Sequence, residues 1–332
     1  MRKLSISVHF ARAVLRHAVT RGVDPLPLLR RNGISPRLLQ ERDARISIER
    51  FADLQISTMH AMQDESLGYC QRVMPLGTWA MMCHAVVGST TLGQALHRHC
   101  RFYSLFDFGP RPELHIEDAR VLIRLVGVAD GDIDPYIAEL SLFNIHRFGS
   151  WLVQEHLPIQ RATLSYSPAA QPEEYRLMFL ANPVSFEQPA CSLVLARSLM
   201  DKPVLQNEQT LARFLRHPVL NMLTLQYERS SWTSRVRELI RQDLMHMPEL
   251  NTIARGLELH PQTLRRRLAS EGTTFKDIKN QLRRDIALHY LGRRGLSIEE
   301  IAHRAGFSES SAFIRAFKGW TGVTPYSYRK GL

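Results

Sequence analysis

The sequence predicts an α+β N-terminal domain followed by an all-α C-terminal domain that holds two helix-turn-helix motifs joined by a long helix. Its 332 residues exceed the usual size of a domain with one core, so two domains are expected. Strand-like alternation of apolar and polar residues is found in the first two hundred or so residues. Basic residues gather after them: from Gln226 onward the chain has 19 Lys and Arg against 11 Asp and Glu, whereas the preceding part has 24 against 21.

The N-terminal part mixes helical and strand patterns. Glu113 to Leu125 alternates on both sides of a Glu117-Asp118 turn, which predicts a hairpin. A long helix is expected next, from about Pro135 to His156. The other expected elements are helices over 6–20, 27–31, 48–62, 91–105 and 173–180, with Pro36 and Pro75 as breaks, and strands over 162–166, 184–186 and 191–194. This mixture is typical of an α+β domain.

The segment from Ile301 to Arg329 carries a helix-turn-helix pattern. Ile301-Ala302 opens a short helix, Gly306 allows a tight turn, and a second helix starts at Ser308 or Glu309. Phe313 and Phe317, four positions apart, predict its buried face. At about 100° per residue the opposite face carries Ser311, Ile314, Arg315 and Lys318. A cationic ridge with an apolar back fits the major groove of DNA, although an ordinary amphipathic surface helix would also show such a ridge.

A degenerate copy of this pattern lies 48 residues upstream, where Ile253-Ala254 corresponds to Ile301-Ala302. Pro261 suits the first position of its second helix, and Leu264 and Leu268 form the buried pair. Gln262, Arg265 and Arg266 then lie on the exposed side as candidate base-reading residues. Three consecutive arginines span about 200° of helix, so Arg267 is expected to turn back toward the protein or a phosphate.

A straight helix is expected between the two copies, from Thr274 to Arg293, because apolar residues recur there at three- and four-residue steps. At 1.5 Å per residue it would span roughly 28 Å, close to the ~34 Å between successive major-groove faces on one side of B-DNA. Four arginines on or after this helix are predicted phosphate partners or solvated charges: Arg283, Arg284, Arg293 and Arg294.

The ordered elements Gly306-Phe-Ser, Phe313-x-x-x-Phe-Lys and Thr321-Gly-Val-Thr-Pro-Tyr-Ser-Tyr-Arg resemble the C-terminal signature of the AraC/XylS family of bacterial transcription factors. That family usually has Ser or Thr where this chain has His260, a weaker N-cap. The N-terminal part resembles the arabinose-binding-like regulatory domain of one branch of the same family. The residues that carry this resemblance are Gly22 to Leu39, Arg45-Ile46-Ser47, Asp64 to Gly68 and Ser89 to Leu96.

The resemblance implies a sequence-specific, DNA-binding transcriptional regulator, an effector-responsive activator that contacts RNA polymerase and acts as a homodimer on double-stranded promoter DNA. It implies an effector-sensing and dimerisation domain over 1–205, a linker over 206–226 and a DNA-binding domain over 227–332. It names no effector, so the ligand-binding residues stay unknown. The alternatives are a ligand-independent or partner-controlled regulator and, in another class, a DNA-repair enzyme that uses the same DNA-binding module. Such an enzyme would need a reactive cysteine in a suitable context, and Cys70, Cys83, Cys100 and Cys191 have none.

Other site types are not favoured by the sequence. No apolar run approaches the ~18 residues of a membrane span and the N-terminus lacks a signal core, so a cytoplasmic protein is expected. His97-Arg-His-Cys100 offers metal-ligating types, but neighbours on a helix diverge, so no metal or cofactor is expected. Glu139 and His146 have no nucleophile at a useful spacing, so no catalytic residue is assigned. The aromatic stretch from Arg101 to Phe108 could line an effector pocket or could be ordinary packing.

Overall fold

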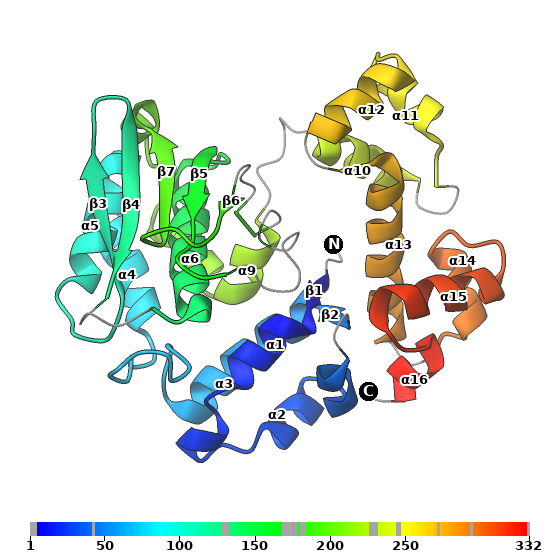
Figure 1. Ribbon diagram of the computed structural model, residues 1–332, viewed down its shortest axis with the longest axis horizontal. Helices are drawn as coiled ribbons and strands as arrows, with labels where there is room; N and C mark the ends of the chain where they lie inside the picture. Colours follow the sequence, from blue (N-terminus) through cyan, green and yellow to red (C-terminus); the bar gives the residue numbers. More distant parts are fainter. Residues whose placement is uncertain are drawn as a thin grey trace. The chain divides into compact units, whose positions relative to one another are not determined.

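The computed structural model describes residues 5–41, 44–127, 133–167, 175, 178–179, 184–225, 232–243, 247–270, 273–292 and 295–330 (Figure 1). The chain divides into two compact units. The first unit holds Ala13–Asp24 and Gln55–Tyr227, and the second unit holds Met1–Arg12, Pro25–Leu54 and Glu228–Leu332. The second unit therefore combines two N-terminal segments with the C-terminal hundred or so residues, and each unit is described by itself.

The first unit is built on a five-stranded sheet in the order β3-β4-β7-β5-β6. The strands are β3 Arg111–Ile116, β4 Arg120–Val126, β5 Ile159–Thr163, β6 Val184–Ser185 and β7 Ser192–Ala196. All neighbouring pairs are antiparallel except β5 and β6. Val121, Ile123 and Leu125 of β4 are buried while Arg124 is exposed, so the sheet buries one face, as its alternating sequence requires.

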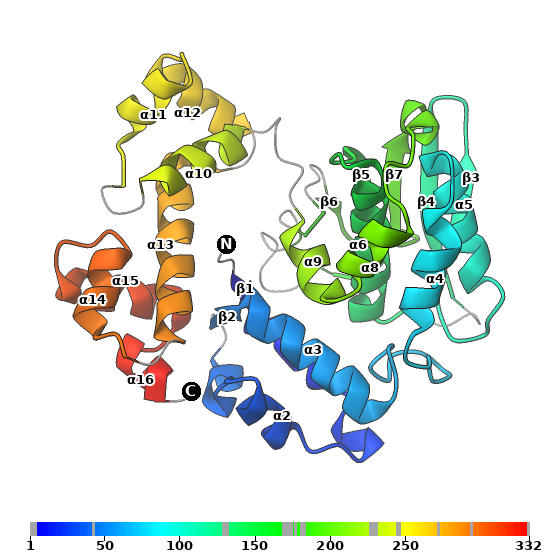
Figure 2. The ribbon, with the colours of Figure 1, turned by 180° about the vertical axis from the view of Figure 1, so that it is seen from behind.

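Three helices supply most of the remaining core of this unit, and Figure 2 shows them from behind. They are α4 Thr78–Val87, α5 Leu92–Tyr103 and α6 Pro135–Val153. Apolar residues of α5 and α6 join the inward residues of β4 and β7 in one hydrophobic cluster. Helix α6 begins where the sequence directs it, because Pro135 takes the first helical position and the Asp134 side chain accepts a hydrogen bond from the Tyr136 N–H.

Residues 206–226, expected as the linker, contain two short helices, α8 Glu208–Phe214 and α9 Pro218–Thr224. Leu211, Phe214 and Met222 are buried and belong to the same hydrophobic cluster as residues of α4 and α6. A flexible linker would leave such side chains in water, so the described part of this span is a packed portion of the first unit.

The second unit contains a two-stranded sheet of β1 Ser5–Ser7 and β2 Arg45–Ser47, which pair antiparallel. Its C-terminal part is helical: α10 Trp232–Gln242, α11 Leu250–Gly256, α12 Pro261–Ser270, α13 Phe275–Leu291, α14 Ile298–Arg304, α15 Ser310–Thr321 and α16 Pro325–Lys330. Helix α2 Pro25–Arg31 and the 3-10 turn η2 Pro36–Gln40 also belong to it, whereas η1 Val19–Arg21 and η3 Arg197–Asp201 lie in the first unit. Helices α1 Val8–Leu15 and α3 Ile48–Met62 each have residues in both units.

The fold class is confirmed: an α+β N-terminal part and an all-helical C-terminal part with two helix-turn-helix units on one long helix. The hairpin at Glu117-Asp118 and the helices over 48–62 and 135–153 agree with the expected elements. Two expected elements were misplaced, and one was missed. The helix expected over 6–20 runs from Val8 to Leu15 after a strand over residues 5–7, and the strand expected over 162–166 is Ile159–Thr163. Helix α4 was not expected. The expected helix over 173–180 lies outside the described residues except for Tyr175, Met178 and Phe179.

Candidate nucleic-acid interface

The second helix-turn-helix unit consists of α14 and α15. Helix α14 starts at a capping box in which the Ser297 hydroxyl accepts the Glu300 N–H and the Glu300 carboxylate accepts the Ser297 N–H. The turn that follows is closed by a hydrogen bond from the Phe307 N–H to the Ala302 carbonyl, 3.0 Å. Gly306 stands in that turn with φ 77°, in the left-handed region that glycine adopts without strain.

Helix α15 has one buried and one exposed face. Phe313 and Phe317 are fully buried and pack at 5.7 Å between ring centroids. The four residues expected opposite them, Ser311, Ile314, Arg315 and Lys318, are all exposed or partly exposed, and 37 % of Ile314 is accessible although it is apolar. An exposed isoleucine beside two cations is suited to contact a thymine methyl group in a major groove.

The first helix-turn-helix unit, α11 and α12, repeats this arrangement. Leu264 and Leu268 are fully buried, while Gln262, Arg265 and Arg266 are exposed. His260 does act at the start of α12: its Nδ1 accepts a hydrogen bond from the Gln262 N–H at 3.3 Å. The turn is closed by a bond from the Leu259 N–H to the Ala254 carbonyl, 2.9 Å. Both residues of that bond lie 48 positions before their counterparts in the second helix-turn-helix unit, so the two helix-turn-helix units are structural repeats.

Arg267 turns back onto the protein, in agreement with its expected direction. Its guanidinium carbon lies 4.1 Å from the centroid of the Trp232 ring of α10, which also carries Arg235 at 4.4 Å. The planar guanidinium stacks on the aromatic face and helps to join α12 to α10. Of the three consecutive arginines, therefore, Arg265 and Arg266 face water and Arg267 packs.

Helix α13 lies between the two helix-turn-helix units, with α11 and α12 near its N-terminal end and α14 and α15 near its C-terminal end (Figure 1). Its start is fixed by a reciprocal capping box between Thr274 and Asp277. Its 17 residues span about 25 Å at 1.5 Å per residue.

The four predicted phosphate partners have different surroundings. Arg283 donates to the Gly306 carbonyl at 3.0 Å and lies over the Phe307 ring, and burial lowers the pKa of this guanidinium. Arg284 Nε lies 4.0 Å from Asp285 Oδ1, with 19 % of the arginine side chain exposed. Both guanidinium groups are thus engaged inside the protein. Arg293 and Arg294 lie outside the described residues.

The stretch His97–Cys100 and the aromatic stretch that follows it lie partly at the surface and partly in the core. His97 and Arg98 are exposed while His99 and Cys100 are buried, and burial lowers the pKa of His99 to about 3. Among the described residues no group of three or more His, Cys, Asp or Glu side chains is placed to hold a metal ion. Phe106, which is 39 % exposed, stacks on Phe108 and contacts Phe102 at a tilted angle of 58°.

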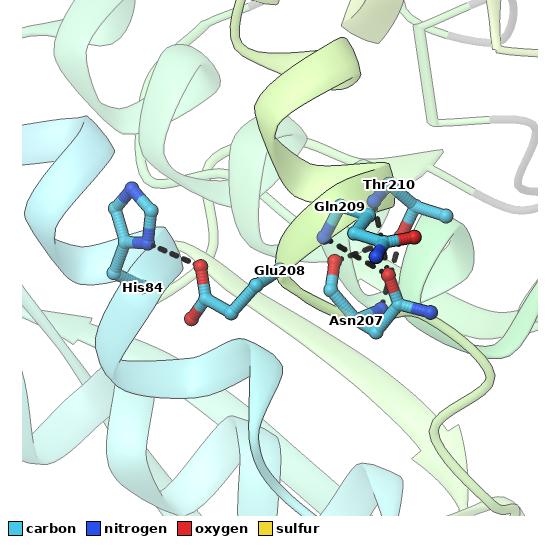
Figure 3. A network of polar contacts seen from close by, with 5 residues as sticks. All are labelled: His84, Asn207, Glu208, Gln209 and Thr210. Carbon is cyan, nitrogen blue, oxygen red and sulfur yellow. Dashed lines mark hydrogen bonds and ion pairs between the residues drawn. The ribbon is translucent and has the colours of Figure 1, made fainter.

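An open cleft of about 440 Å³ lies in the first unit and was not anticipated from the sequence. Trp151, Phe214 and Leu225 give it apolar walls, and the exposed Arg213 adds a cation. One wall is α8, whose N-terminus is held by a capping box between Asn207 and Thr210 (Figure 3). The adjacent Glu208 contacts His84 of α4 at 2.8 Å, so α8 is tied to α4 beside the cleft.

Family models and curated relatives match both the N-terminal and the C-terminal part of the chain. Residues 22–204 match the family model of the arabinose-binding domain of the AraC transcription regulator, and residues 253–331 match a helix-turn-helix domain model. The ornithine utilization regulator of Pseudomonas aeruginosa is 29% identical over 98% of this chain and 96% of its own length. The urease operon transcriptional activator of Escherichia coli is 32% identical over 33% of this chain and 37% of its own. Among solved structures, the regulator CdpR from Pseudomonas aeruginosa is 20% identical, with 97% and 98% of the two chains covered and a TM-score of 0.30.

Proposed function

The chain belongs to the AraC family of transcriptional regulators and is a DNA-binding regulator, and from this premise we propose that it activates promoters in response to a small molecule. In this proposal the C-terminal helices read double-stranded promoter DNA, and the N-terminal part senses the effector and forms a homodimer. The bound protein then contacts RNA polymerase. The division of roles keeps the domains expected from the sequence, 1–205, 206–226 and 227–332, with two differences: Met1–Arg12 and Pro25–Leu54 belong with the C-terminal helices, and the described part of 206–226 is packed in the first unit.

One observation carries the proposed DNA-reading role: two equivalent helices expose polar ridges while their apolar pairs are fully buried. Gln262, Arg265 and Arg266 form the ridge of α12, and Ser311, Ile314, Arg315 and Lys318 form that of α15. Arginine pairs bidentately with guanine and glutamine with adenine, which makes these side chains suited to base-edge readout. The net positive charge of the C-terminal part supplies attraction to phosphate that does not depend on sequence.

The test is selection of bound sequences from a random DNA pool, followed by binding measurements on the selected site. We expect a bipartite site whose two parts are separated by about one helical turn, because α12 and α15 are equivalent units on one connecting helix. A pool that gains no common sequence would reject specific reading. Fusion of the selected site to a reporter promoter then distinguishes activation from repression.

The effector-sensing role draws on the N-terminal family match and on the cleft beside α8. Apolar walls with a few polar groups are typical of small-molecule sites, and the Arg213 guanidinium suits a carboxylate. Ornithine, after which the Pseudomonas aeruginosa relative is named, is the first probe. A ligand that binds only the folded protein should raise its melting temperature. At a ligand concentration of 100 times Kd, the free energy of unfolding increases by about 2.7 kcal/mol. Arg213→Gln is the matched variant: it should abolish the shift if the cleft is the site.

Two outcomes favour the alternative regulators. If no amino acid or related carboxylate shifts the melting temperature and the reporter responds without any additive, the protein is ligand-independent. If the reporter responds only in the presence of a second protein, it is partner-controlled. The DNA-repair alternative needs a reactive thiolate, whereas burial raises the pKa of Cys70 to about 11 and that of Cys100 to about 12, so these thiols stay protonated at neutral pH.

Within the described residues, no helix is both long and apolar enough to cross a membrane.

A further inference from the structure

The strand pair β1–β2 packs against α13, the helix that joins the two helix-turn-helix units. Ser5 pairs with Ser47, Ile6 with Ile46 and Ser7 with Arg45. Ser7 and Ile46 have no exposed surface. Figures 1 and 2 both place this strand pair beside the middle of α13. Residues from the beginning of the chain therefore cover a helix that belongs to the DNA-binding part.

This contact explains why α13 is buried on more than one side. Ile278, Leu282 and Ile286 belong to the core of the first helix-turn-helix unit. Asp285 and Leu288 are also almost fully buried, at 4 % and 2 % exposure, although neither belongs to that core. A helix with polar residues on its free face would expose an aspartate there, so the burial of Asp285 requires a partner.

Asp285 lies where three elements meet. Burial raises the pKa of Asp285, and the rise is opposed by the charges of Arg284 of α13, Arg237 of α10 and Arg45 of β2 and by a hydrogen bond from Ser5 of β1. The Arg45 guanidinium in turn donates from Nε to the Ser5 hydroxyl at 3.0 Å and from Nη2 to the Ser5 carbonyl at 2.9 Å. Arg45 is only 8 % exposed. One buried carboxylate thus connects α10, α13 and the N-terminal strands.

A second contact holds the far end of α13. The Arg50 guanidinium lies so close to Gly292, directly after α13, that a Cβ on this glycine would be 2.6 Å from its Nη2. The same guanidinium lies beside the buried Tyr328 hydroxyl of α16 and favours its ionised form, although burial raises the pKa of that tyrosine to about 12. Arg50 also donates to the Gly33 carbonyl at 2.8 Å. The N-terminal segment therefore contacts α13 at its middle and at its end.

We propose that the N-terminal strand pair β1–β2, with Arg45 and Arg50, is a brace of the DNA-binding part that fixes the second helix-turn-helix unit on α13. Arg45 and Asp285 are positioning residues in this assignment: neither touches DNA, and both act through the placement of α15. The brace goes beyond the proposed function and rests on it in one respect only, the reading role of α15. The first helix-turn-helix unit packs with α10 in a core that also includes Ala305 and the partly buried Phe307 of the second unit, so the contacts of Arg50 with Gly292 and Tyr328 are those directed at the second unit alone.

The experiment uses the full-length protein and a double-mutant cycle of Arg45→Met and Asp285→Asn. Removal of one partner takes away part of the compensation of the other buried group, so each single variant should lower the melting temperature by about 5 °C or more. Each should also weaken binding to the selected DNA site by about tenfold. Because the two residues act together, the double variant should be no worse than the poorer single variant. Arg45→Lys keeps the charge but loses the paired hydrogen bonds from Nε and Nη2 to Ser5. Its melting temperature and DNA affinity should lie between those of wild type and Arg45→Met.

Hydroxyl-radical footprinting separates a brace from general destabilisation. The DNA segment read by α15 is marked by its sensitivity to Arg315→Ala, and the segment read by α12 by its sensitivity to Arg266→Ala. At a temperature where all variants are folded, Arg50→Met, which removes the contact with Tyr328 of α16, should lose protection over the first segment and keep it over the second. Arg37→Met, a surface arginine of the same N-terminal segment, is the matched control and should change neither.

The brace would be overturned if the losses of melting temperature in Arg45→Met and Asp285→Asn were strictly additive. It would also be overturned if Arg45→Met had the same melting temperature and DNA affinity as Arg37→Met. Equal loss of protection over both DNA segments would show that the brace does not act selectively on the second helix-turn-helix unit. If Arg315→Ala altered no segment, the reading role of α15 would fail, and the brace would be decided by the coupling in melting temperature alone.

Discussion

Glu258 and Gly306 occupy equivalent positions in the two helix-turn-helix turns, 48 residues apart, and both have a left-handed backbone, with φ 55° and 77°. Each precedes the residue whose N–H closes its turn, Leu259 in the first unit and Phe307 in the second. Left-handed conformation costs a residue with a side chain about 1 kcal/mol or more, and glycine almost nothing. The first copy therefore keeps the geometry of the turn while it carries strain that the second avoids.

We expect Glu258→Gly to stabilise the protein by about 0.5–1 kcal/mol, because relief of the strain exceeds the extra entropy that glycine has in the unfolded chain. The reciprocal change, Gly306→Ala, should destabilise it by about 1 kcal/mol. Urea denaturation of both variants measures these effects, and Gly319→Ala, a solvent-exposed helical glycine with open space around it, is the control that should stabilise through helix propensity alone. A loss of stability in Glu258→Gly would contradict the assignment of strain.

The exposed arginines of α12 and α15, the two proposed reading helices, should behave differently from Arg267, which packs against Trp232. Arg266→Ala and Arg315→Ala should each cost about 1–3 kcal/mol on the selected DNA site and relax the preference at one or two base pairs. Arg267→Ala, whose guanidinium stacks on Trp232, should lower the melting temperature and leave the sequence preference intact. Competition binding with single-base variants of the site measures both. A changed preference in Arg267→Ala together with an unchanged one in Arg315→Ala would reverse our assignment of the faces.

Binding should weaken steeply with salt. If both helix-turn-helix units engage and each makes several phosphate contacts, the slope of log affinity against log salt should be on the order of −5 or steeper, because each neutralised phosphate releases condensed counterions. Fluorescence anisotropy over a range of salt concentrations gives the slope. Arg283→Ala should leave the slope nearly unchanged, since its guanidinium is engaged with the Gly306 carbonyl and the Phe307 ring. A nearly flat response of the wild-type protein would exclude the two-unit mode of binding.

Local patterns predicted the buried and exposed faces of α12 and α15 well, for a physical reason. The pairs Phe313/Phe317 and Leu264/Leu268 are spaced by one helical turn, and such a pair fixes which side of a short helix is buried. The exposed faces of α12 and α15 follow directly. Likewise, Pro135 and the alternation around Glu117 act within a few residues, so the helix α6 and the β3–β4 hairpin were accessible from the sequence.

Contacts between distant residues were not accessible in this way. Ser5–Ser7 is too short to show an alternating pattern, and it is a strand only because Arg45–Ser47 pairs with it across some forty residues. Asp285 reads as an ordinary polar position of an amphipathic helix, and its burial depends on β1 and β2. From the sequence, Arg283 looks like a solvated or phosphate-binding arginine, because no local pattern indicates that Gly306 and Phe307 lie beside it.

Glu139 of α6 is a buried carboxyl whose protonation should affect stability. It is 3 % exposed and accepts a hydrogen bond from the Tyr166 hydroxyl at 2.8 Å. Burial raises its pKa to about 7; Asp134 adds to the rise, and the hydrogen bonds of Tyr166 and Tyr175 and the charge of Arg16 oppose it. In the folded protein the neutral form is therefore favoured over a range in which the unfolded chain is already ionised.

The sign of the resulting pH dependence follows from proton binding. Between about pH 4.5 and 7 the folded state holds the proton more tightly than the unfolded state, so the contribution of Glu139 to stability is full below that window and is lost as the pH rises through it. Glu139→Gln mimics the neutral carboxyl and keeps an oxygen for Tyr166. We expect it to be as stable as wild type near pH 4.5 and more stable by about 3 kcal/mol at pH 8. Urea denaturation at both pH values measures the difference, with Glu117→Gln, an exposed residue of the hairpin turn, as the control. A gain that is the same at both pH values would show that Glu139 is ionised throughout, and a loss at pH 8 would show that its charge stabilises the fold.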